Sequence, residues 1–384
     1  MPTNAQGHAI REEIGLRGNR VEAGASIAVA ETSAGKIRGF IRNGNYTYKG
    51  IPYGDTTAGR NRFLPPVPAP SWTGTRSCMT WGPICPQAPR MGSDVRDESY
   101  REEEFLFEWN NGVQDENCLC LNVWSPGVRD GGKRPVMVWI HGGHFAVGSS
   151  QELNSCHGEN LCRRGDVVVV SLNHRLNVFG FLDLSRFGEP YAASGIVGIL
   201  DIVLALKWVR DNISEFGGDP ENVTIFGQSG GGGKVTTLMA MPLAQGLFNK
   251  AIVQSNCALK QMPRDLSARV TAEVLSALGL DRSRVSNLHD LPFSDLVEAE
   301  QEAMQKLALP VNPARRNYRV RWEPVVDGNI LPDHAFDPVA PEVSANVPLL
   351  VGTTLNEFVN GIGHPEFEDV SEAEMIEDVR KYFG

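Results

Sequence analysis

The middle of the chain contains short runs of β-branched residues that alternate with segments of helical periodicity. Val136–Ile140 and Val167–Leu172 are nearly uniform apolar runs, which are typical of strands buried on both faces of a sheet. Between the second run and the next one, Val223–Phe226, the apolar residues of 198–216 recur at helical spacing. The strand pattern is repeated further on by Ala251–Val253 and Val347–Val351. Strands alternating with helices predict an α/β fold, with helices on both faces of a largely parallel sheet.

The regions on either side of this pattern are less regular. Residues 1–26 predict a flexible N-terminal tail, and residues 27–384 predict a single α/β domain. Within that domain, Ile27–Thr32 and Lys36–Ile41 predict a short hairpin. The region 263–310 is more polar and has a helical pattern. We therefore expect one large domain that carries a helical insertion or cap over its sheet.

The charge balance excludes some partners. The chain has 36 Lys and Arg against 46 Asp and Glu, a net charge of -10, whereas nucleic acids and anionic membranes bind cationic surfaces. We expect no run of about eighteen apolar residues, the length that crosses a bilayer. The N-terminus also lacks the basic segment followed by an apolar segment that is typical of a signal peptide. Seven cysteines at irregular spacings do not suggest a disulfide scaffold. We expect a cytoplasmic protein without nucleic-acid or membrane partners, with secretion as the alternative and the oligomeric state open.

A serine lies at the junction of a predicted strand and a predicted helix. The segment Gly227-Gln228-Ser229-Gly230-Gly231 matches the pattern G-x-S-x-G. In a chain with 40 glycines the pattern alone is weak, but a position between strand and helix is that of a nucleophile elbow. Such a turn exposes the hydroxyl and puts the next amide at a helix N-terminus, where it can stabilise an oxyanion. Ser229 is therefore the candidate nucleophile.

Two other sequence patterns near this serine suggest phosphate binding and metal binding, but each lacks residues that such a site requires. Gly230–Gly233 followed by Lys234 suggests a phosphate-binding loop, but Gln228 and Val235 replace the glycine and the hydroxyl residue that such a loop requires. His141 and His144 have H-x-x-H spacing, but no third ligand follows at helical spacing. We therefore expect neither a metal nor a cofactor.

Three longer segments resemble signatures of the type-B carboxylesterase and cholinesterase family. Phe216-Gly217-Gly218 with Val223 to Gly231 is similar to the active-serine signature, Glu116 to Val123 (ENCLCLNV) to EDCLYLNV, and Asn173 to Leu182 (NHRLNVFGFL) to NYRLxxFGFL. The resemblance spans roughly residues 30 to 360 and is nearest to the bacterial para-nitrobenzyl-esterase-like branch. It implies an α/β-hydrolase fold and hydrolysis of a small-molecule carboxylic ester through an acyl-enzyme on Ser229.

The resemblance also implies the rest of the site. His141-Gly142-Gly143-His144-Phe145 is similar to the HGGGF loop, so the amides of Gly143, His144 and Gly230 are expected to form the oxyanion hole. His144 replaces the third glycine and brings a side chain to the mouth of the site. Glu357 stands where the family has its triad acid after a strand.

The triad histidine is not identified by this reasoning. Chain order in this fold places it well beyond the acid, yet only His364 follows Glu357. A serine without a base is a poor nucleophile. We therefore predict that the C-terminal part of the domain is missing and that this chain alone is nearly inactive; a non-catalytic binding protein on the same scaffold is the alternative. The resemblance further implies a disulfide or close thiol pair between Cys85 and Cys118.

Overall fold

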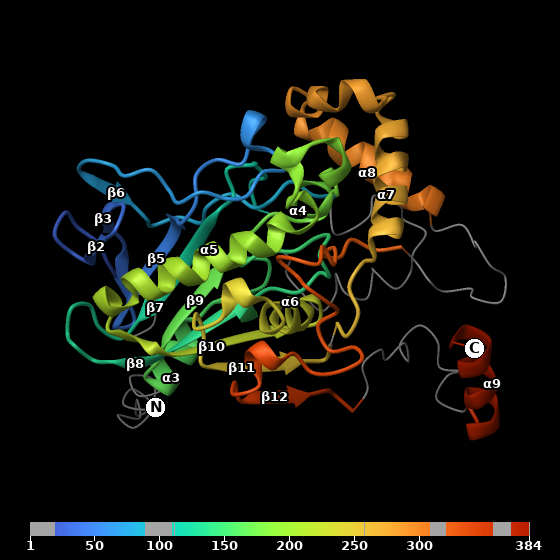
Figure 1. Cartoon of the computed structure of the whole chain (residues 1–384). Helices are drawn as coiled ribbons and strands as arrows, with labels where there is room; N and C mark the ends of the chain where they lie inside the picture. The colour runs from blue at the N-terminus through green and yellow to red at the C-terminus, as the bar shows by residue number, and fades with distance from the viewer. Residues whose placement is uncertain are drawn as a thin grey trace, which may run out of the picture.

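The computed structural model describes residues 20–88, 110, 112–256, 258–307, 320–355 and 370–383. Within these ranges a central sheet is covered by helices, and two helices form a cap at one end (Figure 1). The strands are β1 Val21–Glu22, β2 Val29–Thr32, β3 Gly35–Arg38, β4 Phe40–Arg42, β5 Asn45–Pro52, β6 Thr75–Ser77, β7 Cys120–Ser125, β8 Arg134–Ile140, β9 Val168–Leu172, β10 Gly218–Gln228, β11 Lys250–Gln254 and β12 Leu349–Gly352. The helices are α3 Glu159–Gly165, α4 Asn177–Phe181, α5 Val197–Asn212, α6 Gly230–Met239, α7 Arg264–Ala277, α8 Phe293–Leu307 and α9 Glu372–Phe383.

The large sheet has nine strands in the order β1-β4-β5-β7-β9-β8-β10-β11-β12. Strands β9, β8, β10, β11 and β12 run parallel to one another, whereas β1, β4, β5, β7 and β9 pair antiparallel. The predicted α/β class is confirmed, and the predicted parallel sheet is the half of the sheet that carries the β-branched runs. Its antiparallel half is built from strands β1, β4, β5 and β7 of the N-terminal region, of which β4 and β5 form a hairpin.

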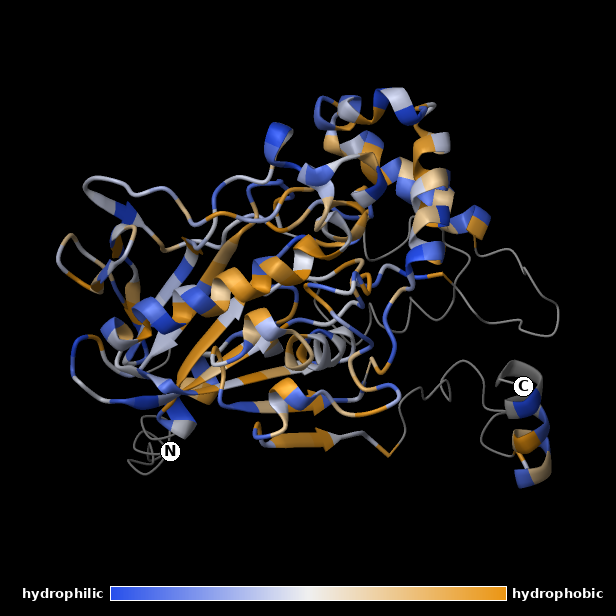
Figure 2. Ribbon diagram, viewed as in Figure 1, coloured by the Kyte–Doolittle hydropathy of each residue, from blue (hydrophilic) through white to orange (hydrophobic). Residues whose placement is uncertain are grey.

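Both faces of the sheet are covered, as the uniform β-branched runs predict. On β9, Val168 and Val170 are fully buried in the main core with α5, while Val169 packs on the other face with Cys162 of α3. Apolar residues accordingly colour much of the central strands and of α5 in Figure 2. Burial on both faces is what favours apolar residues at every position of such a strand.

The N-terminal expectations are met in part. β2 and β3 form the predicted hairpin, with Val29 opposite Arg38. The following β4 leaves that small sheet and joins the large one, where it pairs with β1. Strand β1, at residues 21 and 22, lies within the expected tail, and β4 provides its backbone hydrogen-bond partners.

One helical stretch has the composition of a membrane span. Glu189–Phe216 is long and apolar enough to cross a bilayer, so the expectation that no segment has this composition is wrong. However, 78% of its apolar window is buried inside the structure. A helix that is apolar on nearly all sides is also the expected form of a core helix, and α5 lies across the face of the sheet in that way (Figure 1).

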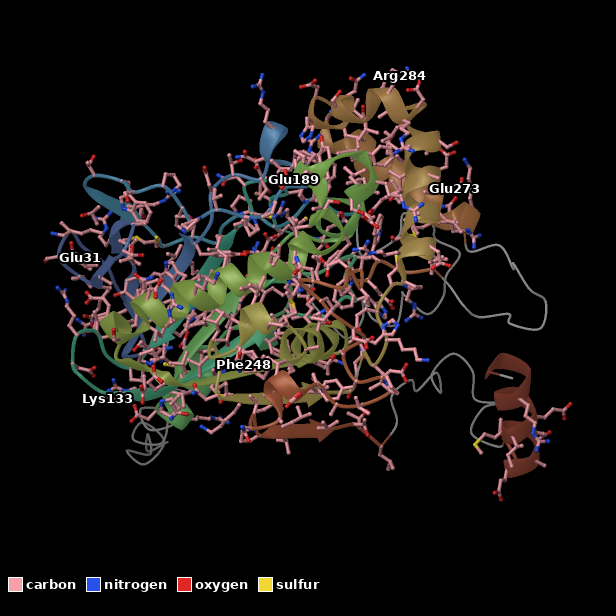
Figure 3. The ribbon with its side chains drawn as sticks, viewed as in Figure 1. Glu31, Lys133, Glu189, Phe248, Glu273 and Arg284 are labelled. Atoms are coloured by element: carbon pink, nitrogen blue, oxygen red, sulfur yellow. The ribbon has the colours of Figure 1, made fainter. Side chains whose placement is uncertain are left out.

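The described part of the predicted helical region, residues 263–307, contains the helices α7 and α8. The helices α7 and α8 pack against each other beyond the carboxyl ends of the parallel strands (Figure 1). Figure 3 shows Glu273 and Arg284 on the outer side of this cap, whereas Phe248 lies within the body. The cap therefore covers the end of the sheet at which the candidate nucleophile is placed.

The cysteines within the described residues are buried thiols. Cys85 and Cys118 nevertheless lie together, since a hydrogen bond with the Cys85 side chain and burial raise the pKa of Cys118 well above its usual value. Leu176 N also donates to Cys85 Sγ at 3.2 Å. Of the two forms predicted for this pair, the structure has the close thiol pair and not the disulfide.

Candidate active site

Ser229 occupies a sharp turn between β10 and α6. β10 ends at Gln228, α6 begins at Gly230, and Ser229 between them has φ 53° and ψ -127°. A non-glycine residue in this region stores strain of about 1–3 kcal/mol, as expected of a nucleophile elbow. Two hydrogen bonds hold the turn: Ser229 N donates to Gln254 O at 2.9 Å, and Gly233 N donates to Ser229 O at 3.2 Å. The half-buried serine therefore lies at a helix N-terminus, at the carboxyl edge of the sheet.

The two glycines after the serine allow the turn to pack against the loop that follows β8. A Cβ atom on Gly231 would overlap the carbonyl oxygen of Ile140. A Cβ atom on Gly230 would overlap the backbone of His144. Main chain thus fills the space that side chains would need, which explains why this part of α6 is rich in glycine although glycine disfavours helix by about 1 kcal/mol relative to alanine.

Residues 141–147, here called the oxyanion loop, follow β8 directly. The loop turns back on itself through two left-handed residues, Gly143 with φ 81° and His144 with φ 54°. The turn is closed by Ala146 N and Val147 N, which both donate to Gly143 O, at 3.3 and 3.1 Å. His144 is exposed. Histidine is among the residues that tolerate this conformation, so the loop keeps its shape without a third glycine.

The structure brings the predicted nucleophile and the predicted oxyanion-hole residues together. A Cβ atom on Gly142 would lie 3.6 Å from the Cβ atom of Ser229, so the loop passes directly beside the nucleophile. The close approach of Gly230 to the His144 backbone adds the helix N-terminus to the same place. Backbone amides of a tight loop and of a helix N-terminus are suited to stabilise a developing negative charge. Their role as the oxyanion hole, with Gly143 as the third amide, stays a prediction.

A lysine lies beneath the oxyanion loop, and the sequence reasoning did not assign it to the site. Lys234 of α6 is fully buried. Its ammonium donates to His141 O at 2.9 Å and to Gly142 O at 3.3 Å, and Nζ lies 5.8 Å from the centroid of the Phe145 ring. The signal in the sequence was a charged residue five positions after the serine, within a helix whose neighbours are otherwise small or apolar.

Two stacked histidines lie next to this lysine. The rings of His141 and His174 are 4.9 Å apart between centroids and inclined by 17°. His174 Nδ1 is 2.7 Å from the carbonyl oxygen of Arg175, which can only accept, so Nδ1 carries the hydrogen. Burial first, and then the charge of Lys234, lower the pKa of His174 well below its usual value. His174 is therefore neutral at pH 7 and serves as part of the apolar support under the loop.

Glu357, the predicted triad acid, lies outside the described residues. The strand before it can still be placed. Gly352 at the end of β12 pairs with Gln254 of β11, which pairs in turn with Gln228 of β10. These strands are parallel, so the chain after β12 leaves the sheet at the same edge as the candidate nucleophile. This placement is compatible with the predicted role of Glu357 and does not test it.

The remaining histidines do not supply an evident base. His334 Nδ1 accepts from Gln261 N at 3.0 Å, and His289 Nε2 is 2.7 Å from the hydroxyl of Tyr191. His157 packs on an indole ring with 5.0 Å between centroids. Two histidines lie outside the described residues: His8 and His364. The prediction that the triad histidine is not identified therefore stands as it was made.

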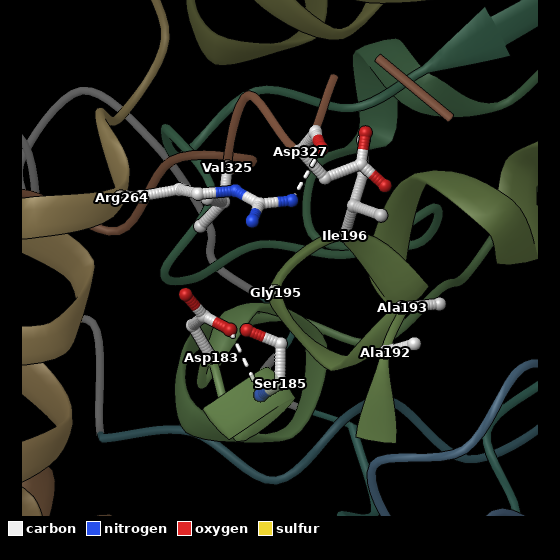
Figure 4. A pocket seen from close by; sticks show the side chains of 9 residues that line it. All are labelled: Asp183, Ser185, Ala192, Ala193, Gly195, Ile196, Arg264, Val325 and Asp327. Carbon is white, nitrogen blue, oxygen red and sulfur yellow. Dashed lines mark hydrogen bonds between the residues drawn. The ribbon is translucent and has the colours of Figure 1, made fainter. Parts of the chain in front are cut away.

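Two pockets lie apart from Ser229. The first, with a volume of ≈ 10 Å³, has Asp183 on one side and Arg264 and Asp327 on another (Figure 4), and it is about the size of one water molecule. The second, of ≈ 380 Å³, is lined by seven residues of the cap and the neighbouring loops: Arg60, Leu64, Pro190, Tyr191, Ser286, His289 and Asp290. Across the described ranges, no three His, Cys, Asp or Glu side chains are grouped so as to hold a metal ion.

Comparison with known proteins places the chain in one family. The family model described as "Carboxylesterase family" matches residues 26–380. The para-nitrobenzyl esterase of Bacillus subtilis (strain 168) is 39% identical over 329 residues, which are 86% of this chain and 63% of that protein. The phenmedipham hydrolase of Pseudarthrobacter oxydans is 31% identical over 86% of this chain and 61% of its own length. This chain thus spans less than two thirds of the length of either relative.

Solved structures agree with this assignment. The crystal structure of a Geobacillus stearothermophilus carboxylesterase superimposes with a TM-score of 0.75 at 35% identity, covering 93% of this chain and 68% of that one. A para-nitrobenzyl esterase structure matches with a TM-score of 0.74 at 36% identity, covering 91% and 68%. The chain therefore belongs to the carboxylesterase family and has its α/β-hydrolase fold.

Proposed function

We propose that this protein hydrolyses small-molecule carboxylic esters through an acyl-enzyme on Ser229. The observation that carries the proposal is the strained turn that holds Ser229 at the N-terminus of α6, directly beside the oxyanion loop. The relatives named para-nitrobenzyl esterase and carboxylesterase support an ester as the substrate. No cofactor is needed for this chemistry, since the nucleophile and the stabilising amides come from the chain itself.

The reaction proceeds in two similar halves. The Ser229 oxygen attacks the ester carbonyl carbon while its proton passes to a general base, and the carbonyl oxygen becomes an oxyanion. The amides of Gly143, His144 and Gly230 donate hydrogen bonds to that oxyanion. The tetrahedral intermediate then expels the alcohol, which takes the proton from the base. Water attacks the acyl-enzyme in the same way and releases the acid, and Glu357 orients the base and stabilises its protonated form.

Covalent labelling tests the nucleophile. A fluorophosphonate probe reacts with an activated serine by displacement of fluoride, and mass spectrometry of the digested natural full-length protein is expected to place the phosphonate on Ser229. Ser229→Ala is expected to abolish both labelling and hydrolysis of p-nitrophenyl acetate. Removal of a catalytic nucleophile of this kind lowers kcat by up to about a millionfold.

A second serine provides a matched control. Ser255 follows β11, also has a positive φ, of 52°, and is also half-buried. It is not at a helix N-terminus and not beside the oxyanion loop, so Ser255→Ala is expected to keep the labelling of the unaltered protein. Labelling that persists in Ser229→Ala would show a different nucleophile. A natural full-length protein that takes up no probe at any serine would instead favour the non-catalytic binding function.

A further inference from the structure

Lys234 connects the helix that carries the nucleophile to the oxyanion loop. Its side chain is fully buried, and its ammonium donates to the carbonyl oxygens of His141 and Gly142 at 2.9 and 3.3 Å. Burying a lysine is costly unless its charge is well stabilised. A residue that serves only to fill space on α6 would not need this charge, so its position indicates a task in the loop above it.

The peptide unit between Gly142 and Gly143 suggests what that task is. In a trans peptide the carbonyl and the N–H point to opposite sides of the same plane. Lys234 Nζ, at 3.3 Å, holds the Gly142 carbonyl on the side of α6 together with His141 Nδ1, which is 3.0 Å from the same oxygen. The Gly143 N–H is thereby turned to the other side. A cation at the carbonyl also polarises the unit and makes the N–H a stronger donor. Gly143 N–H is one of the three amides expected in the oxyanion hole.

We propose that Lys234 is a positioning residue for the oxyanion hole: it aims and strengthens the Gly143 amide through the Gly142 carbonyl. The inference deepens the proposed function and rests on it. The other hydrogen bonds within the loop end on the same stretch of main chain: Ala146 N and Val147 N both donate to Gly143 O, and His141 Nδ1 lies 3.0 Å from the Gly142 carbonyl oxygen. The stacked pair of His141 and His174 supports the same segment from below.

Lys234→Met in the natural full-length protein tests the proposal, since methionine has nearly the length of lysine but no charge and no donor. Complete loss of one oxyanion-hole donor lowers kcat by about a hundredfold to a thousandfold. Lys234 acts one peptide away, so we expect kcat for p-nitrophenyl acetate and the rate of phosphonate labelling at Ser229 to fall about tenfold to a hundredfold. KM is expected to change less than about twofold, because the hole stabilises the transition state and not the bound ester.

Two further variants separate positioning from a general loss of packing. Lys234→Arg keeps the positive charge and is expected to restore part of the lost rate. Thr237→Val is the matched control on α6: Thr237 is also fully buried, but its hydroxyl donates to Gly233 O within the same helix, at 2.8 Å. It is expected to lower thermal stability without slowing the labelling of Ser229.

Hydrogen exchange gives a readout that does not depend on ester hydrolysis. We expect faster exchange at the Ala146 and Val147 amides in Lys234→Met and unaltered exchange in the central strands. A natural full-length protein that neither hydrolyses the ester nor takes up the probe contradicts the proposed function. The exchange rates of the Ala146 and Val147 amides then still test whether Lys234 positions the loop. The inference is overturned if Lys234→Met exchanges these two amides as the unaltered protein does, or labels Ser229 at the same rate.

Discussion

The centre of the large sheet and its β12 edge have the same kind of sequence and very different surroundings. Val253 of β11 and Val351 of β12 are partners in the parallel register, yet Val253 is 0% exposed and Val351 is 54% exposed. β11 lies between two strands and under α6, whereas β12, as far as the chain is described, pairs on one side only. A β-branched run thus predicts a strand, and the order of strands decides whether the strand is buried.

The site is built in the buried region. The nucleophile, the oxyanion loop and Lys234 belong to β8, β10 and α6, where backbone approaches backbone so closely that glycine is required. At the β12 edge Leu350 is 64% exposed and Leu355 is 97% exposed. Precise placement of catalytic groups depends on such tight packing around them, and mutations of matched residues can measure the difference between the two regions.

The largest expected difference is between two glycines, one from each region. Gly231→Ala puts a methyl group into the Ile140 carbonyl oxygen, which is main chain and cannot move away, whereas a Cβ atom on Gly352 of β12 would meet nothing within 4 Å. We expect Gly231→Ala to destabilise the protein by about 3 kcal/mol or more and to stop the labelling of Ser229. Gly352→Ala is expected to change stability by less than about 0.5 kcal/mol. Urea denaturation and probe labelling check both; similar losses in the two variants would show that the elbow is not unusually tight.

Residue patterns were sufficient for much of the fold. The strands of the parallel half, the helix α5 and the helical cap were predicted because uniform apolar runs and helical spacing report burial directly. In the antiparallel half, β5 and β7 were predicted from Tyr46–Ile51 and Leu119–Trp124. The two-residue strand β1 was not predicted, since so short an exposed strand is stabilised by a partner that is distant in the sequence. Ser229 was placed in its turn by local sequence alone.

Other parts of the site could not be predicted from local sequence. The role of Lys234 depends on β8 and β10 being neighbours, because only this pairing puts the oxyanion loop over α6. The thiol state of Cys85 and Cys118 depends on their surroundings and not on their spacing. The family resemblance supplied the amides of the oxyanion loop and Glu357, and it did so by analogy with signatures and not by a physical argument.

The cap shares features of both regions, because its outer side is exposed and its interior contains a buried acid. Glu300 of α8 is 6% exposed, and burial raises its pKa from 4.5 to about 8, although hydrogen bonds from Val178 N and the Trp322 side chain oppose the shift. Below pH 4.5 the folded and unfolded forms both hold the proton. Between about 4.5 and 8 the unfolded chain ionises first, so the free energy of unfolding falls as the pH rises, and above 8 the loss is complete.

Glu300→Gln is expected to remove this decrease, which amounts to a few kcal/mol at about 1.4 kcal/mol per pKa unit. Urea denaturation at pH 5 and pH 8 measures it as a difference between variant and unaltered protein. The control is Glu298→Gln, on the same helix but exposed, which is expected to keep the original slope. If Glu300→Gln loses as much stability between the two pH values as the unaltered protein, the cap is not the source of the pH dependence.

The smallest expected effects come from Val253 and Val351, the partners in the parallel register of β11 and β12. They test the contrast between the centre and the edge of the sheet most directly. Val253→Ala removes two methyl groups from a buried position and leaves a cavity, for which we expect a loss of about 2 kcal/mol. Val351→Ala removes the same groups from a side chain that is already half in water, so the expected loss is below about 0.5 kcal/mol. Chemical denaturation in parallel measures both values, and the slopes against urea concentration are expected to be equal. The two changes are chemically identical and lie on adjacent strands, so their difference reports burial and not β-propensity. If Val351→Ala cost as much as Val253→Ala, then β12 would be covered in solution, and the contrast between centre and edge would be wrong for the folded protein.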